Sequence, residues 1–177
     1  MSQIVVERNI DLESERAALW CAVSDAERLN RAIGLGRQQL EPNSDASAAR
    51  FVVHTVSAGL PLEYEERPFE WIENRCFSVR RVLHSGVMKS MQHSFTLEPR
   101  PKGGSTLSVR LVIEPRYALL GLLIRLQTAR MADRIEAEFK SVDRDLRAGQ
   151  GVCFRIDHTP VDGAALARGR GARSLRR

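Results

Sequence analysis

Hydrophobic and polar residues alternate along this chain with the period of β-strands in two separate regions. Between residues 4 and 10, and again between residues 37 and 115, apolar side chains recur at every second position. This pattern indicates strands with one buried face. Turn-forming residues interrupt the second region at Gly59, at Gly86 and at residues 101–104. The pattern therefore predicts one strand and, later in the chain, about six antiparallel strands.

Two short helices are predicted between the first strand and the others. Trp20 is expected to face inward from the first helix, and Asp11 or Ser14 to cap its N-terminus. Ser24 and Glu27 have the spacing of a capping box, in which each side chain bonds the backbone amide of the other. We therefore expect Ser24 to cap the second helix.

Residues 117–147 are predicted to form a single amphipathic helix about 45 Å long at the rise of an α-helix. A curved sheet packed against one long helix leaves a gap between them, and such gaps are typical ligand sites. Its main apolar face comprises Leu120, Ile124, Met131, Ile135, Phe139, Val142 and Leu146.

Four further leucines at the start of this helix lie outside the main apolar face. They would pack against the short helices, line the wall or the entrance of a cavity, or contact a membrane surface or a second subunit. These residues are Leu119, Leu122, Leu123 and Leu126.

The chain has 177 residues and a formal net charge of +5, but the excess of positive charge is confined to its end. Five arginines and no acidic residue occupy positions 168–177, so residues 1–167 have no net charge. We therefore expect one domain at residues 1–148, followed by a linker and a disordered basic tail at residues 149–177. No specific nucleic-acid partner is expected, and the tail would at most bind phosphate or anionic lipid weakly.

The cysteines and the apolar runs bear on the compartment. Cys21, Cys76 and Cys153 are odd in number and form no CxxC pair, which predicts reduced thiols. The N-terminal segment is not shaped like a signal peptide, and no apolar run approaches the ~20 residues of a membrane span. We therefore expect a cytoplasmic protein without a transmembrane segment.

Three segments, in this order, resemble the START-like superfamily, also called SRPBCC. Residues 11–35 carry a tryptophan on the first predicted helix and Ser-Asp before the second. Residues 68–80 contain Pro-Phe-Glu-Trp and then Phe-Ser-Val-Arg, and residues 107–116 run into Tyr117. Members of the superfamily include polyketide cyclases, lipid-transfer domains and birch-pollen-allergen-like proteins. The resemblance implies an α+β helix-grip fold, with a curved antiparallel sheet of about seven strands around a long C-terminal helix.

A narrower resemblance concerns the segment after this domain. Residues 161–168, Val-Asp-Gly-Ala-Ala-Leu-Ala-Arg, are similar to the linker that follows an N-terminal domain of this type in some bacterial adenylate/guanylate cyclases. This resemblance implies a sensory or regulatory module of a larger signalling protein.

Motifs for phosphate loops, dinucleotide sites, nucleophile elbows and zinc proteases are all absent, so no catalytic residue, metal ligand or cofactor is predicted. The candidates are instead residues on faces that the alternation directs inward, together with residues of the long helix. The predicted ligand-binding residues are Tyr64, Trp71, Glu73, Arg81, His93, Phe95, Leu119, Leu123, Gln127 and Met131.

His93 is the most informative of these candidates because it alternates with Met91 and Phe95. It would either orient a polar ligand group or be a core histidine bonded to a neighbouring strand. Glu73 and Arg81 would need a charged partner if buried, and they would either pair with each other or reach the rim.

Three functions remain open from the sequence. The leading hypothesis is a non-enzymatic protein that binds a hydrophobic small molecule or lipid in the cavity. The second is a cyclase/dehydratase-like enzyme, which would need an acid–base pair such as His93 with Tyr64 or Glu73. The third is the regulatory module of a larger protein.

Overall fold

A seven-stranded antiparallel sheet and three α-helices form the part of the chain that the computed structural model describes, namely residues 3–42, 51–57 and 59–151. The predicted tail beyond residue 151 lies outside these residues. The elements in chain order are β1 (Ile4–Leu12), α1 (Arg16–Val23), α2 (Ala26–Ala32), β2 (Gln39–Pro42), β3 (Phe51–Ser57), β4 (Leu60–Ile72), β5 (Cys76–Leu83), β6 (Met88–Pro99), β7 (Ser105–Pro115), a 3₁₀ turn at Ala118–Leu120, and α3 (Gly121–Arg147).

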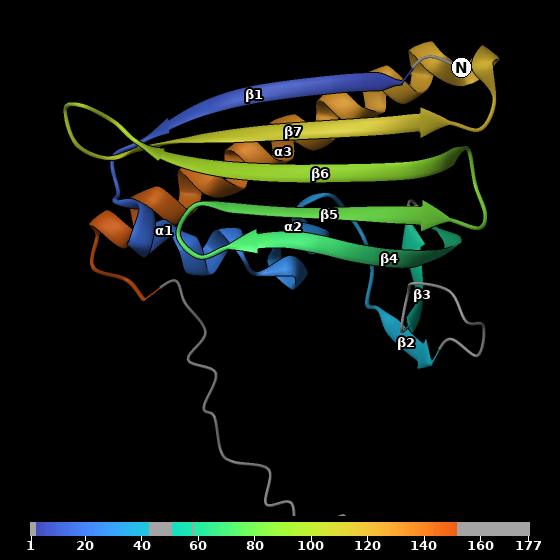
Figure 1. The fold of residues 1–177 in the computed structure, drawn as a ribbon, viewed down its shortest axis with the longest axis horizontal. Helices are drawn as coiled ribbons and strands as arrows, with labels where there is room; N and C mark the ends of the chain where they lie inside the picture. Colours follow the sequence, from blue (N-terminus) through green and yellow to red (C-terminus); the bar gives the residue numbers. More distant parts are fainter. Residues whose placement is uncertain (1–2, 43–50, 58, 152–177) are drawn as a thin grey trace, which may run out of the picture.

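The strands are ordered β1-β7-β6-β5-β4-β3-β2, so the first strand pairs with the last. Figure 1 shows α3 crossing one face of the sheet behind β1, β7 and β6, with α1 and α2 beside it. β2 and β3, at the other edge, turn away from the remaining strands (Figure 1). The predicted α+β helix-grip fold is therefore confirmed.

The alternation in the sequence determines which face of each strand is buried. In β7 the buried positions are Ser105, Leu107, Val109, Leu111, Ile113 and Pro115, which alternate with more exposed residues. In β6, Met91, His93, Phe95 and Leu97 are buried in the same way. Both strands therefore direct a full row of side chains toward the helices.

The long helix begins later than the sequence pattern predicts. Tyr117 is extended, and residues 118–120 form a 3₁₀ turn before α3 starts at Gly121. The predicted apolar face is otherwise confirmed, because Ile124, Ile135, Phe139 and Val142 are all buried.

Both short helices are capped differently from the prediction. Asp25, and not Ser24, caps α2 by accepting the backbone N–H of Arg28, while the Ser24 hydroxyl donates to the Trp20 carbonyl. The two residues are adjacent, and only one can take the extended cap conformation.

The N-terminus of α1 has no cap from Asp11 or Ser14, because its N-cap residue is Glu15, which makes no side-chain cap bond. The carboxylate of Asp143 in α3 instead accepts the backbone N–H groups of Glu13 and Ser14. A contact across 129 residues cannot be found by a local capping rule.

The buried apolar side chains form two clusters. The larger lies between the sheet, α1, α2 and the C-terminal half of α3, around Leu19, Phe95, Leu107 and Phe139. The smaller lies between strands β3 to β7 and the N-terminal half of α3. It comprises Val53, Tyr64, Leu83, Met91, Ile113 and Ile124, with Met88 and Met131 packed against it.

Candidate ligand-binding site

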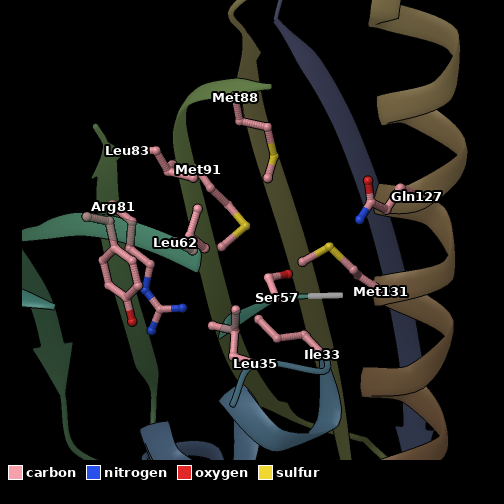
Figure 2. A pocket seen from close by; sticks show the side chains of 11 residues that line it. Ile33, Leu35, Ser57, Leu62, Arg81, Leu83, Met88, Met91, Gln127 and Met131 are labelled. Carbon is pink, nitrogen blue, oxygen red and sulfur yellow. The ribbon is translucent and has the colours of Figure 1, made fainter. Parts of the chain in front are cut away.

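A cavity lies beside the smaller cluster, between the sheet, the end of α2 and α3. Its volume is about 40 Å³, which is room for a few water molecules. Figure 2 shows the lining side chains converging from the strands on one side and from α3 on the other. The lining residues are Ile33, Leu35, Ser57, Leu62, Tyr64, Arg81, Leu83, Met88, Met91, Gln127 and Met131.

Arg81 is the only charged residue among those that line this cavity, and it is one of the most deeply buried side chains of the described residues, with 2% of its surface exposed. Its Nε donates to Oε1 of Glu66 at 3.0 Å, and its Nη2 donates to Oδ1 of Asn30 at 2.8 Å. The guanidinium carbon also lies 4.8 Å from the centre of the Tyr64 ring, a cation–π contact. Strand β4 and helix α2 thus fix the position of the charge.

The third guanidinium nitrogen of Arg81, Nη1, forms no such hydrogen bond. Nη1 is buried and has no hydrogen-bond partner among the residues that the structure describes. Figure 2 shows the guanidinium group reaching toward the space that Leu62, Leu35 and Ser57 surround. A buried donor without an acceptor is costly, so this N–H group is suited to an acceptor that enters the cavity.

The phenol of Tyr64 is the second polar group at this end of the cavity. Its oxygen accepts a hydrogen bond from Nε2 of Gln38 at 2.6 Å. Burial raises the pKa of Tyr64 to about 12, against the lowering effect of Arg81. The phenol is therefore neutral at physiological pH and is an ill-matched proton acceptor or donor for catalysis there.

His93 lies beside a second, smaller cavity of about 10 Å³, which is room for about one water molecule. Its ring lies 6.3 Å from that of Phe77 and 5.8 Å from that of Phe95, between centroids. Burial, together with the charge of Arg81, lowers the pKa of His93 well below 6.5, so the imidazole is neutral. His93 and Tyr64 line different cavities and do not form the acid–base pair that the enzyme hypothesis requires.

Six of the ten predicted site residues line one or both of these cavities. Tyr64, Arg81, Gln127 and Met131 line the larger cavity, and His93, Phe95 and Met131 line the smaller one. Leu119 and Leu123 are exposed and line neither of these two cavities.

Trp71 lies on the inward face, as predicted, but neither Trp71 nor Glu73 lines either of these two cavities. A bulge between Arg67 and Glu70 shifts the register of β4 against β5, and β4 then reaches the end of the sheet. Trp71 remains 52% exposed there, and its ring packs against those of Trp20 and Phe77. Glu73 lies in the exposed turn between the two strands, so it does not pair with Arg81.

Several lining residues were not among the predicted site residues. Met91, Leu62 and Leu83 share the inward faces that the alternation had identified, but no rule separated them from ordinary core residues. Asn30 looks like a surface residue of a short helix, and only its contact with Arg81 reveals its position.

No family model and no curated protein matches this chain. Solved structures do match. Zhui aromatase/cyclase from Streptomyces sp. R1128 is 14% identical with a TM-score of 0.61, over 85% of this chain and 100% of that one. A START superfamily protein from Mycobacterium smegmatis is 13% identical with a TM-score of 0.57, over 80% of this chain and 98% of that one. The chain has a START-like fold.

A third match is the di-domain ARO/CYC protein StfQ of the steffimycin biosynthetic pathway, with 12% identity and a TM-score of 0.58. The match covers 83% of this chain but 52% of StfQ, so the START-like domain described here spans about half of that protein.

A metal site would need several ligating side chains close together in the described residues. Within this part of the chain, no group of three or more His, Cys, Asp or Glu side chains is arranged to hold a metal ion. Among the described residues, no helix is both long and apolar enough to span a membrane.

The thiols differ from the prediction of uniformly reduced cysteines. Cys76 has a free thiol, but Cys21 is disulfide-bonded. Spacing along the chain does not give distance in space, so the sequence pattern was insufficient here.

Proposed function

We propose that this protein binds a hydrophobic small molecule or lipid that carries one hydrogen-bond acceptor, such as a carboxylate, sulfonate or carbonyl group. The observation that carries the proposal is the unpartnered Nη1 of buried Arg81 at an otherwise largely apolar cavity. The acceptor would bond Nη1, and the apolar part of the ligand would contact the leucines and methionines of the cavity wall. The fold, which resembles that of START superfamily proteins, supports this kind of role.

The cavity must widen to admit such a ligand. Its volume of about 40 Å³ is far below the ~300–1,000 Å³ that is typical of small-molecule sites. Three of the lining residues are methionines, Met88, Met91 and Met131, whose unbranched side chains change rotamer readily. In this proposal the observed cavity is the closed form, and the methionines move aside when the ligand enters.

Binding without catalysis is favoured over the cyclase/dehydratase alternative. The aromatase/cyclase neighbours share the fold, but here the proposed acid–base partners do not line one cavity. The regulatory-module hypothesis is compatible with ligand binding and remains a prediction.

The test is binding of 1-anilinonaphthalene-8-sulfonate, a fluorescent probe with apolar rings and one sulfonate. Arg81→Gln should weaken its binding at least about tenfold, because a hydrogen bond to a charged group contributes about 1.5–3 kcal/mol. The matched control is Arg80→Gln, which removes the neighbouring exposed arginine of the same strand and should leave affinity unchanged. Circular dichroism and thermal unfolding establish that both variants are folded.

The outcome also depends on the probe's acceptor. N-phenyl-1-naphthylamine, which lacks the sulfonate, should bind the wild type and the Arg81→Gln variant equally. Equal binding of the sulfonate probe by all three proteins, or no binding by the wild type, would refute the proposal.

A further inference from the structure

The 3₁₀ turn at Ala118–Leu120 and the start of α3 together expose four leucines. Leu119 is 99% exposed, Leu122 83%, Leu123 59% and Leu126 50%. We call these four residues the leucine face. Their spacing of three and four residues keeps them together over two helical turns. Contiguous exposed apolar surface of this kind marks an interaction site more often than does a scattered leucine.

The leucine face continues onto the first strand of the sheet. An open depression of about 410 Å³ lies between β1 and α3, and Leu122 and Arg125 line it together with Val5. Val5 is itself 42% exposed. Apolar side chains thus continue from the helix to the edge strand of the sheet, with Gln3 and Arg125 between them.

The charged residues that α3 itself places beside the leucine face are of one sign. Arg125 and Arg130 are exposed on the same helix and form no ion pair with any described residue. The sequence has no acidic residue between positions 115 and 132, and the first one, Asp133, forms an ion pair with Arg8 at 2.9 Å. The partner of this surface is therefore expected to be apolar at its centre and negatively charged at its border.

We propose that the leucine face docks on an anionic lipid membrane, with the first turns of α3 lying in the plane of the interface. Leucines that enter the acyl boundary and arginines that contact lipid headgroups are the two components of interfacial helix binding. A second copy of this chain fits less well. A symmetric contact through this face would bring the unpaired arginines of both copies together, and like charges at an interface are unfavourable.

The leucine face also borders the cavity. Gln127 lines the cavity, and it follows Leu126 directly and lies one helical turn after Leu123. A docked molecule would hold the α3 wall of its cavity close to the membrane. Docking does not require that the cavity binds a ligand, so the two proposals are tested separately.

The experiment is co-sedimentation of the full chain with vesicles of phosphatidylcholine alone, and of phosphatidylcholine with about a quarter phosphatidylserine. The wild type should bind the anionic vesicles and not the neutral ones, and added salt should weaken binding. Leu122→Ser combined with Leu126→Ser should lower the partition coefficient at least about tenfold. Arg125→Gln combined with Arg130→Gln should lower it by a factor of about ten or more.

Matched controls use exposed residues elsewhere in the fold. Leu40→Ser with Leu60→Ser removes two leucines that are 60% and 69% exposed at the β2–β4 edge of the sheet, and should leave partitioning unchanged. Arg80→Gln combined with Arg144→Gln removes the same amount of charge as the variant that replaces Arg125 and Arg130.

Equal binding to neutral and anionic vesicles, equal losses in the test and control variants, or no vesicle binding by the wild type would overturn the proposal. So would dimerisation in sedimentation velocity that the leucine variant abolishes, if it occurs without vesicle binding. Affinity for the sulfonate probe, measured in parallel, reports on the cavity alone.

Discussion

Nη2 of Arg81 in β5 donates a 2.8 Å hydrogen bond to Oδ1 of Asn30 in α2. Both residues are buried, with 2% and 4% of their surfaces exposed. The bond connects the sheet to the short helices, and together with Glu66 it holds the guanidinium so that Nη1 remains unpartnered. The position of the candidate binding group therefore depends on an uncharged residue 51 positions away in the sequence.

Replacing Asn30 should accordingly affect both stability and the site. Asn30→Ala removes the acceptor of a buried charged donor, and we expect the free energy of unfolding to fall by about 1–3 kcal/mol. Urea denaturation measures this loss, and the sulfonate probe should bind less tightly because the guanidinium is less well fixed. Asn9→Ala, which removes an exposed bond to Ser108, is the control and should cost under about 0.5 kcal/mol. A similar cost for the two variants would contradict this account.

Asp143 should make the protein sensitive to acid. Burial raises the pKa of Asp143, but hydrogen bonds from Ser14 and Glu13, with the charge of Arg147, outweigh burial and hold the pKa below 3.8. The unfolded chain therefore takes up the proton first, so this stabilisation is complete above pH 3.8 and is lost as pH falls toward the lower folded-state pKa.

Asp143→Asn tests this directly. We expect it to lower the free energy of unfolding by about 1–3 kcal/mol at neutral pH, because the segment that leads into α1 loses the charged acceptor of its two backbone N–H groups. The difference from wild type should shrink below pH ~3, where the wild-type carboxyl is also protonated. Asp133→Asn, which alters an exposed ion pair, should change stability little at either pH. A cost for Asp143→Asn that is independent of pH would show that its charge is unimportant.

His93 acts in a different pH range. Its pKa in the folded protein lies well below 6.5 because of burial and, second, the charge of Arg81. The unfolded chain binds the proton first, so the stability of the wild type should fall as pH drops below 6.5, by at most about 1.4 kcal/mol per pH unit from this residue. His93→Leu should remove that part of the slope in urea denaturation, and His84→Gln, at an exposed site, should retain it. An unchanged slope in His93→Leu would contradict the neutral state of the ring.

Met131 lies at both cavities and should limit their size. Met131→Ala is expected to lower the free energy of unfolding by about 1–3 kcal/mol while raising affinity for the sulfonate probe, because the cavity no longer has to be opened. Val142→Ala, in the larger apolar cluster, should destabilise the fold without raising affinity. If probe binding weakens in Met131→Ala, the site lies elsewhere.

The fold could be predicted from the sequence because most of its information is local and periodic. Alternation along β5, β6 and β7 gave the buried faces, and the spacing of Ile124, Ile135 and Phe139 gave the buried face of α3. The helix start was misplaced because the leucines at 119 and 120 continue the apolar pattern into a 3₁₀ turn.

The site was predicted only in part, because it depends on contacts between distant residues. Arg81 and Tyr64 could be placed on inward faces, but nothing local indicates that Asn30 and Glu66 hold the guanidinium. The bulge in β4 likewise places Trp71 opposite Phe77, where it packs against Trp20 and not at either cavity, and no residue type in that segment marks the bulge. The contact of Asp143 with the backbone N–H of Ser14 could not be predicted either, because the two residues are 129 positions apart in the sequence.

The most direct test of ligand binding between the sheet and α3 is an NMR titration of the ¹³C-labelled methionine methyl groups with the sulfonate probe. The chain has four methionines, and Met88, Met91 and Met131 line the cavity. We predict that the signals of these three residues shift with one common dissociation constant, and that Arg81→Gln weakens this constant at least about tenfold. Probe binding that leaves the three signals unchanged, or no binding at all, would contradict the account.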